Sequence, residues 1–228
     1  MLVHNYEENS TGTDWFVGDI HGEYNKFSDA LMRINFDFNN DRMFCVGDLV
    51  DRGPESLKCL TLLDEPWFFS VKGNHEQMML DALLLSDDRE RLFARQMWEG
   101  NGGSWYRDLP YEYKLMAKKY INKVNELPNA IKVGDIGVIH AECPLQDWDI
   151  LAIDQGRYLR EEAMWSRKRM SSQSNWKVRG IKAVVVGHTP VKEATVLGNH
   201  VYIDLGVCFG DEKDFTIYSY DDIVALIT

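Results

Sequence analysis

Polar side chains that can bind metals or phosphate follow several apolar segments of this sequence, directly after the point where each segment ends. A turn after a buried strand needs none of these side chains, and burying them is costly unless they have partners. Ligands of α/β sheets gather at the carboxyl ends of strands, so these residues could form one site. The motifs are GDIHG, GDLVDRG, GNHE, VIHAE and GHTP, and they contain Asp19, His21, Asp48, Asp51, Arg52, Asn74, His75, His140 and His188.

These side chains offer carboxylate, imidazole and amide donors but no thiolate, a set typical of catalytic sites for Mn²⁺, Fe or Zn²⁺. Asp48 has two carboxylate oxygens, so we predict that it bridges two ions about 3.5 to 4 Å apart. Such a pair would deprotonate a shared water molecule and stabilise both ends of an in-line displacement at phosphorus. The other predicted ligands are Asp19 and His21 for the first ion, and Asn74, His140 and His188 for the second.

The remaining charged residues of these motifs have predicted roles beside the metal ligands. The planar guanidinium of Arg52 is suited to contact phosphate oxygens. His75 follows the ligand Asn74 but binds no metal in this interpretation, so it could protonate the leaving alkoxide as a general acid, oriented by Asp51. A second cation is expected, and Arg167 in MWSRKRM is a candidate, although by local sequence alone that segment is typical of a charged surface.

The other two histidines are predicted to lie outside this site. His200 follows Gly198 and Asn199 in a second GNH, but there the glycine and asparagine separate two strand-like segments, as in a hairpin turn. His4 belongs to a polar leader. Asp135, in a second VGD, is also followed by strand-like residues rather than a helix, so it too is predicted to lie in a hairpin turn.

Strands that lead to the predicted site alternate with helices in the first part of the sequence. DWFVGD, RMFCVGD and PWFFSVKGN are short apolar segments, rich in β-branched and aromatic residues, that each reach a glycine. The segments that follow them show helical spacing of apolar residues, such as Phe27, Ala30, Leu31 and Ile34. This βαβαβα order predicts a parallel sheet covered by helices.

Residues from about Arg89 to Glu126 are predicted to form two further helices, interrupted by EGNGGSW, whose glycines suit a helix end and a loop. The later segments AIKVGDIGVIHAE, AVVVGHTP, ATVLGNHVYIDLG and FTIYSYDD are typical of strands joined by tight turns. We therefore expect a second, more antiparallel sheet. Two packed sheets flanked by helices accommodate both halves, in a single domain over residues 1–228.

Composition restricts the partners and the location of the protein. The net charge is −11, which disfavours binding to nucleic acid or to an anionic membrane surface. The first residues show no signal-peptide pattern, and no stretch approaches 18 uninterrupted apolar residues, so we expect a cytoplasmic protein. The four cysteines form no C-x-x-C pair and are expected to be reduced and mostly buried. A monomer is expected.

The order and spacing of GDIHG, GDLVDRG, GNHE, HAE and GHTP resemble the metal-dependent serine/threonine phosphoprotein phosphatases of the calcineurin-like phosphoesterase superfamily. GNHEQMM, NGGSW and WSR are similar to the group that contains the bacteriophage lambda protein phosphatase and its bacterial relatives. The resemblance extends from about Trp15 to Phe215. It implies a four-layer α/β/β/α sandwich, a site for two divalent ions that usually holds Mn²⁺, and direct hydrolysis of phosphomonoesters on protein substrates without a phosphoenzyme.

The resemblance also implies a role for each matching residue. His75 and Asp51 match the acid pair, while Arg52 and Arg167 match the phosphate contacts, and for Arg167 the family is the main support. One departure is Glu142, because the lambda-like pattern HAD is HAE here, and the longer side chain could alter the neighbouring geometry or the substrate contacts. The matching metal ligands are Asp19, His21, Asp48, Asn74, His140 and His188.

Other functions stay open as alternatives. Dinucleoside polyphosphate hydrolases are similar in the same motifs, but they typically have GNHD where this chain has Glu76, and they lack the counterpart of Asp51. A pseudo-enzyme that binds phosphoproteins would be expected to lack a metal ligand or the acid, and none is missing here. A nucleic-acid phosphoesterase is disfavoured by the acidic composition and by the absence of a basic, aromatic-rich stretch.

Overall fold

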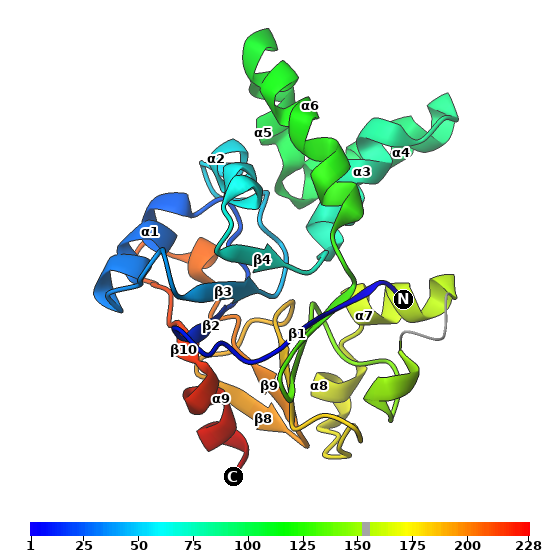
Figure 1. Cartoon of the computed structure of the whole chain (residues 1–228). Helices are drawn as coiled ribbons and strands as arrows, with labels where there is room; N and C mark the ends of the chain where they lie inside the picture. Colours follow the sequence, from blue (N-terminus) through cyan, green and yellow to red (C-terminus); the bar gives the residue numbers. More distant parts are fainter. Residues whose placement is uncertain (152–155) are drawn as a thin grey trace.

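The computed structural model describes residues 1–151 and 156–228. Its strands form two sheets that pack against each other, with helices outside them (Figure 1). The four-stranded sheet has the order β10-β2-β3-β4, with β2 (Asp14–Val17), β3 (Arg42–Cys45), β4 (Phe68–Ser70) and β10 (Tyr218–Ser219). The six-stranded sheet has the order β1-β5-β6-β7-β9-β8, with β1 (Val3–Tyr6), β5 (Ala130–Val133), β6 (Ile136–Ile139), β7 (Ala183–Val186), β8 (Thr195–Leu197) and β9 (His200–Tyr202).

The predicted alternation of parallel strands and helices in the first part of the chain is confirmed. β2, β3 and β4 are parallel, and α1 (Tyr24–Arg33), α2 (Ser56–Thr61) and α3 (Asn74–Leu84) follow them. Phe27 and Leu31 are buried on one face of α1, as their helical spacing predicted. Because these strands are parallel, the residues after each strand come out at the same edge of the sheet.

The segment that was expected to hold two helices contains three. α4 (Asp88–Trp98) ends in a π-helical turn at Glu99–Gly103, in the glycine-rich interruption that the sequence indicates. α5 (Ser104–Asp108) then ends before Pro110, and α6 (Tyr111–Glu126) begins. Proline disfavours a helical conformation in the residue before it and lacks the N–H that would continue a helix. The apolar spacing alone does not reveal this second break.

The second sheet was expected to be more antiparallel, and among the described residues it is mixed, with three parallel and two antiparallel strand pairs. β6, β7 and β9 are parallel neighbours, and antiparallel pairs join β5 to β6 and β8 to β9. The opening segment with His4 is not a polar leader but the edge strand β1, parallel to β5. FTIYSYDD contributes β10, which pairs with β2 in the other sheet. Local patterns identify strands, whereas long-range contacts select their partners.

The described residues form three hydrophobic cores between the four layers. One lies between the four-stranded sheet and the helices α1, α2, α3 and α6. The second lies between the two sheets, where residues such as Phe44 and Val185 meet, and α9 (Tyr220–Ile227) packs at its margin. The third covers the outer face of the six-stranded sheet with α7 (Arg157–Trp165). The predicted α/β/β/α class is thus confirmed. Among the described residues, no helix has the length and apolar character needed to span a membrane.

Candidate active site

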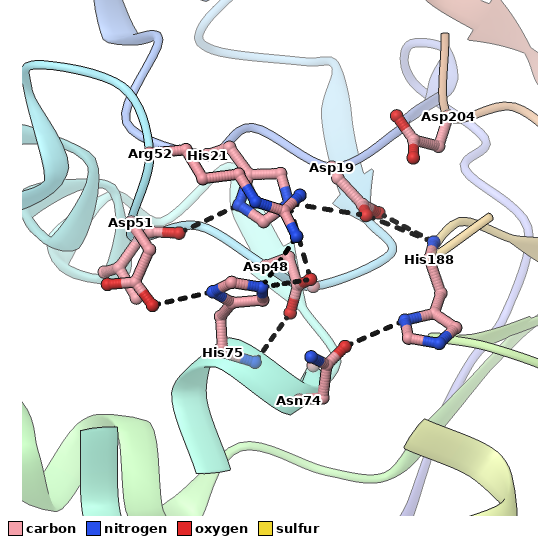
Figure 2. Close-up of polar contacts among 12 residues, drawn as sticks. Asp19, His21, Asp48, Asp51, Arg52, Asn74, His75, His188 and Asp204 are labelled. Carbon is pink, nitrogen blue, oxygen red and sulfur yellow. Dashed lines mark hydrogen bonds and ion pairs between the residues drawn. The ribbon is translucent and has the colours of Figure 1, made fainter. Parts of the chain in front are cut away.

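Most of the predicted site residues directly follow strands of both sheets, whereas Asn74 and His75 begin α3 and Arg167 follows α7. Figure 2 shows how the side chains that it labels converge. Several of these residues have a positive φ, between 45° and 75°, so the chain turns sharply as each strand ends. A non-glycine residue in this conformation costs about 1 to 3 kcal/mol, a cost that clusters at functional sites. The residues with positive φ are His21, Asp48, Asp51, Arg52 and His188.

Asp48 lies at the centre of the group. Its Oδ2 is 3.5 Å from His21 Nε2 on one side and 3.4 Å from His140 Nε2 on the other. The carboxyl group is almost fully buried and takes part in two clusters of possible ligands, one with His21 and His75, the other with His140 and His188. The position between two clusters is the one that a bridging ligand requires. The sequence analysis placed His75 outside the ligand set, whereas the first cluster includes it.

The histidine rings have the orientation of metal ligands. His21 Nδ1 donates to Val50 O at 3.0 Å and His140 Nδ1 donates to Val46 O at 2.7 Å, because a carbonyl oxygen can only accept. Backbone hydrogen bonds of this kind fix the ring and leave Nε2 as the donor toward a metal. Burial lowers the pKa of His21 to about 3, so its imidazole is neutral and has a free lone pair.

Three donors converge around Asn74. Its Oδ1 is 2.8 Å from His140 Nε2 and 2.9 Å from His188 Nδ1. Two ligands that bind one ion at about 2.1 Å and at right angles lie about 3 Å apart, so these separations match those of neighbouring ligands. Burial lowers the pKa of His188 to about 3 and keeps it neutral. The side chains present therefore fit a divalent ion at this position.

Asp19 and Asp204 add buried negative charge to the same place (Figure 2). Asp19 accepts from the backbone N–H of His188 at 3.1 Å, and its Oδ2 is 3.8 Å from His21 Nε2. Burial, Asp204 and Asp48 together raise the pKa of Asp19. This excess of buried carboxylates is a favourable environment for cations. Sequence reasoning missed Asp204, although it follows strand β9 in YIDLG as the recognised carboxylates follow their strands.

His75 and Asp51 form a buried pair beside the ligand clusters. His75 Nδ1 donates to Asp51 Oδ2 at 2.7 Å, which leaves Nε2 directed toward the site. The carboxylate also accepts from Trp98 Nε1, at 2.9 Å to Oδ2, and from Trp105 Nε1, at 2.7 Å to Oδ1. Both tryptophans lie around the glycine-rich interruption, to which the sequence analysis gave no contact with Asp51. Their indole N–H groups stabilise a carboxylate that has no contact with solvent.

The guanidinium of Arg52 contacts two histidines of the candidate site. Its Nη1 contacts His21 Nε2, and its Nη2 is 3.1 Å from His75 Nε2. The guanidinium stacks over the ring of Phe209 at 5.1 Å, and the backbone N–H of Arg52 donates to Gly102 O at 3.3 Å. The cation is thereby directed toward His21 and His75 from the connection after β3.

Arg167 reaches the site from the connection after α7, and its Nη2 donates to His188 O at 3.1 Å. The segment is therefore not merely a charged surface. Glu142 explains how it is placed, because its two carboxylate oxygens accept from the backbone N–H groups of Lys168 at 3.0 Å and Arg169 at 2.9 Å. These groups begin α8 (Lys168–Ser172). Glu142 thus links the connection after β6 to the arginine segment.

Glu76 is a further residue whose role sequence reasoning missed. It is fully buried and accepts from the backbone N–H groups of Asp48 at 2.8 Å, Leu49 at 2.8 Å and Gly73 at 2.9 Å. Burial and the charge of Asp48 raise its pKa to about 7. Glu76 therefore holds the turn of GDLVDRG against the start of α3.

The residues predicted to lie outside the site do so. Asp135 is in the turn between β5 and β6, and Gly198 and Asn199 connect β8 to β9. His200 is buried, accepts from the backbone N–H of Cys143 at 3.0 Å and packs against Trp176. All four cysteines are free, and three of them are buried.

Comparison with known proteins places this site in a family context. The sequence profile of the calcineurin-like phosphoesterases matches residues 15–212. The chain is 34% identical over 202 residues to serine/threonine-protein phosphatase 1 of Salmonella typhimurium, covering 87% of this chain and 88% of that protein. It is 44% identical to the symmetrical bis(5'-nucleosyl)-tetraphosphatase of Wigglesworthia glossinidia brevipalpis, but over only 68 residues, or 29% of this chain and 25% of that protein. The fold is similar to that of a protein serine/threonine phosphatase from Saccharomyces cerevisiae, with a TM-score of 0.61, 15% identity, and coverage of 95% of this chain and 82% of that one.

Proposed function

The chain belongs to the calcineurin-like phosphoesterase family, and from this premise we propose that it is a metal-dependent protein phosphatase. The proposed reaction is the hydrolysis of phosphoserine and phosphothreonine monoesters, with phosphotyrosine as a further substrate to be tested. The observation that carries the proposal is the convergence of buried metal donors around Asp48, directly beside the His75–Asp51 pair.

We propose that the site holds two divalent ions, of which Mn²⁺ is the preferred candidate and Fe or Zn²⁺ the alternatives. Ions bound there would polarise the phosphoryl oxygens and activate a water molecule for attack on phosphorus. Support for this cofactor comes from the neutral histidines, the buried carboxylates and the donor separations around Asn74. The proposed ligands are Asp19, His21 and Asp48 for one ion, and Asp48, Asn74, His140 and His188 for the other.

The remaining side chains would bind the phosphoryl group and move a proton. Arg52 contacts His75, Arg167 contacts His188, and both would neutralise the phosphoryl oxygens. His75 would transfer its Nε2 proton to the leaving oxygen, so that the product is a neutral serine or threonine hydroxyl. Asp51 would hold the ring through Nδ1 and stabilise its protonated form.

Metal dependence provides the first test. Removal of metal with a chelator should abolish phosphate release from p-nitrophenyl phosphate, and Mn²⁺ should restore it. Metal analysis of protein purified without added ions should find up to two ions per chain. Full activity in metal-free protein would contradict the proposal. Asp19→Asn should mainly weaken the binding of one ion.

A dinucleoside polyphosphate hydrolase is the second candidate, favoured by the partial match to the tetraphosphatase. The phosphate leaving group of such a substrate needs little protonation, so the buried His75–Asp51 pair would contribute little to its hydrolysis. We therefore expect kcat/KM with Mn²⁺ to be higher for a phosphoserine or phosphotyrosine peptide than for diadenosine tetraphosphate. A clear preference for the dinucleotide would move the protein to the class of dinucleoside polyphosphate hydrolases.

The single domain, the cytoplasmic location and the monomeric state stay predictions.

A further inference from the structure

A groove beside Arg167 has a surplus of cationic side chains, although the net charge of the protein is −11. Its volume is about 960 Å³, and it lies between the ends of α3 and α6 on one side and α7 on the other. Arg167 and Trp165 form the end next to the candidate active site, where both contact His188. The cationic side chains are Lys72, Arg157, Arg160, Arg167 and Lys168, and the carboxylates are Asp81, Glu161 and Glu162.

Only part of this positive charge is neutralised inside the groove. Lys72, Arg160 and Arg167 make no ion pair with a carboxylate among residues 1–151 and 156–228. Lys72 is largely buried, and its ammonium group donates to Asn125 O at 2.9 Å. The two ion pairs in the groove join Arg157 Nε to Glu161 Oε1 at 2.7 Å and Lys168 Nζ to Glu162 Oε1 at 2.9 Å.

We propose that this groove binds the polypeptide segment next to the phosphorylated residue of the substrate and selects for acidic side chains in that segment. The inference rests on the proposed phosphatase function and specifies its substrate class. When the phosphate lies between the metal ligands and Arg167, the neighbouring chain can continue along α7. Leu127 and Met164 supply apolar wall for that chain, and Lys72 and Arg160 supply the charge.

The position of Arg160 on α7 predicts how far the acidic residues of the substrate lie from the phosphorylated residue. Arg160 precedes Trp165 by five positions on α7, which corresponds to about 7.5 Å along the helix axis. An extended peptide covers that distance in two to three residues, at about 3.3 Å per residue. Acidic residues two to four positions from the phosphorylated residue should therefore meet Arg160, and Lys72 lines the same groove.

The test compares phosphoserine peptides that carry three glutamates or three glutamines at positions two to four, on either side of the phosphoserine. Each partly exposed charge pair changes binding by a factor of about 1.5 to 5. We expect kcat/KM to be about three- to tenfold higher for the glutamate peptide on one of the two sides, mainly through KM. Added salt should reduce the difference, because mobile ions screen such pairs. Equal kcat/KM values for the glutamate and glutamine peptides on both sides would overturn the inference.

Reversal of the charge at Arg160 tests whether the preference for the glutamate peptide arises in the groove. Arg160→Glu should abolish or invert the preference for the glutamate peptide, measured as the ratio of the two kcat/KM values. Lys119→Glu is the matched control, because Lys119 is an exposed lysine on α6 outside the groove and its replacement causes the same change in net charge. The ratio should stay at its original value in this control. An unchanged ratio in Arg160→Glu, or an equal loss in both variants, would refute a role for the groove.

Failure of the proposed phosphatase function would give a different result from failure of the inference about the groove. If the wild-type protein releases phosphate from p-nitrophenyl phosphate but from no phosphopeptide, the phosphatase proposal falls and the inference falls with it. If both peptides are hydrolysed equally, the phosphatase proposal stands and only the inference is refuted.

Discussion

Asp51→Asn is expected to weaken proton donation by His75 without removing a metal ligand. Asp51 is completely buried and accepts hydrogen bonds from His75 and from the indoles of Trp98 and Trp105. Asparagine has almost the same shape, but it carries no charge and only one of its terminal atoms accepts hydrogen bonds. The variant therefore replaces a charge-assisted bond to His75 by a neutral one, and leaves an indole N–H without its acceptor.

The size of the effect follows from that replacement. A hydrogen bond to a charged group contributes about 1.5 to 3 kcal/mol, and one between neutral groups about 0.5 to 1.5 kcal/mol. The difference of about 1 to 1.5 kcal/mol corresponds to roughly tenfold in rate. We expect kcat to fall about tenfold or more for a phosphoserine peptide, whose alkoxide must be protonated. For p-nitrophenyl phosphate, whose leaving group needs little protonation, the fall should be clearly smaller.

The pH profile gives an independent measurement. Burial lowers the pKa of His75, but the carboxylates of Asp48 and Asp51 outweigh burial, and the net effect raises this pKa. A general acid must be protonated, so peptide hydrolysis should decline as the pH rises through the pKa of His75. Without the charge of Asp51 that pKa is lower, and the alkaline limb of the kcat profile should move to lower pH.

Single and double variants of His75 and Asp51 test whether the two residues act on the same proton. His75→Asn should reduce kcat on the phosphoserine peptide by about 10² to 10⁴, and Asp51→Asn should add little in that background, because both act on one proton. Metal content and the unfolding temperature are measured for every variant. Equal losses on both substrates, an unshifted alkaline limb or loss of bound metal would each show that Asp51 does not act through His75.

Three further changes test other contacts of the site. Asp48→Asn should lower the content of both ions, measured by metal analysis of the purified protein, because this carboxylate faces both ligand clusters; normal metal content would exclude a bridging role. Glu142→Gln loses one of two acceptors for backbone N–H groups and should loosen Arg167, so that KM for phosphopeptides rises about three- to tenfold with a smaller change in kcat. Trp105→Phe removes an N–H donor from the buried carboxylate of Asp51 and should lower the free energy of unfolding in urea by about 1.5 to 3 kcal/mol, whereas an unchanged urea midpoint would contradict that contact.

The sequence by itself predicted the candidate site residues and the parallel strands β2, β3 and β4 of the four-stranded sheet. Each motif is local, because an apolar strand and the charged residues that end it lie within a few positions of each other. GDLVDRG therefore indicated that Asp48, Asp51 and Arg52 do more than form a turn, and parallel strands explained how such motifs meet. Chemistry of this kind can be predicted because the residue types and the strand ends appear together in the chain.

Only the tertiary structure decided which side chains support those residues. Trp98 and Trp105 have the sequence signature of ordinary core aromatics, and nothing local shows that their N–H groups meet Asp51. Glu142 holds a helix that begins 26 positions later. The partners of the strands in the second sheet also depend on distant segments. These contacts depend on where remote parts of the chain meet during folding, and local periodicity carries no information about that meeting.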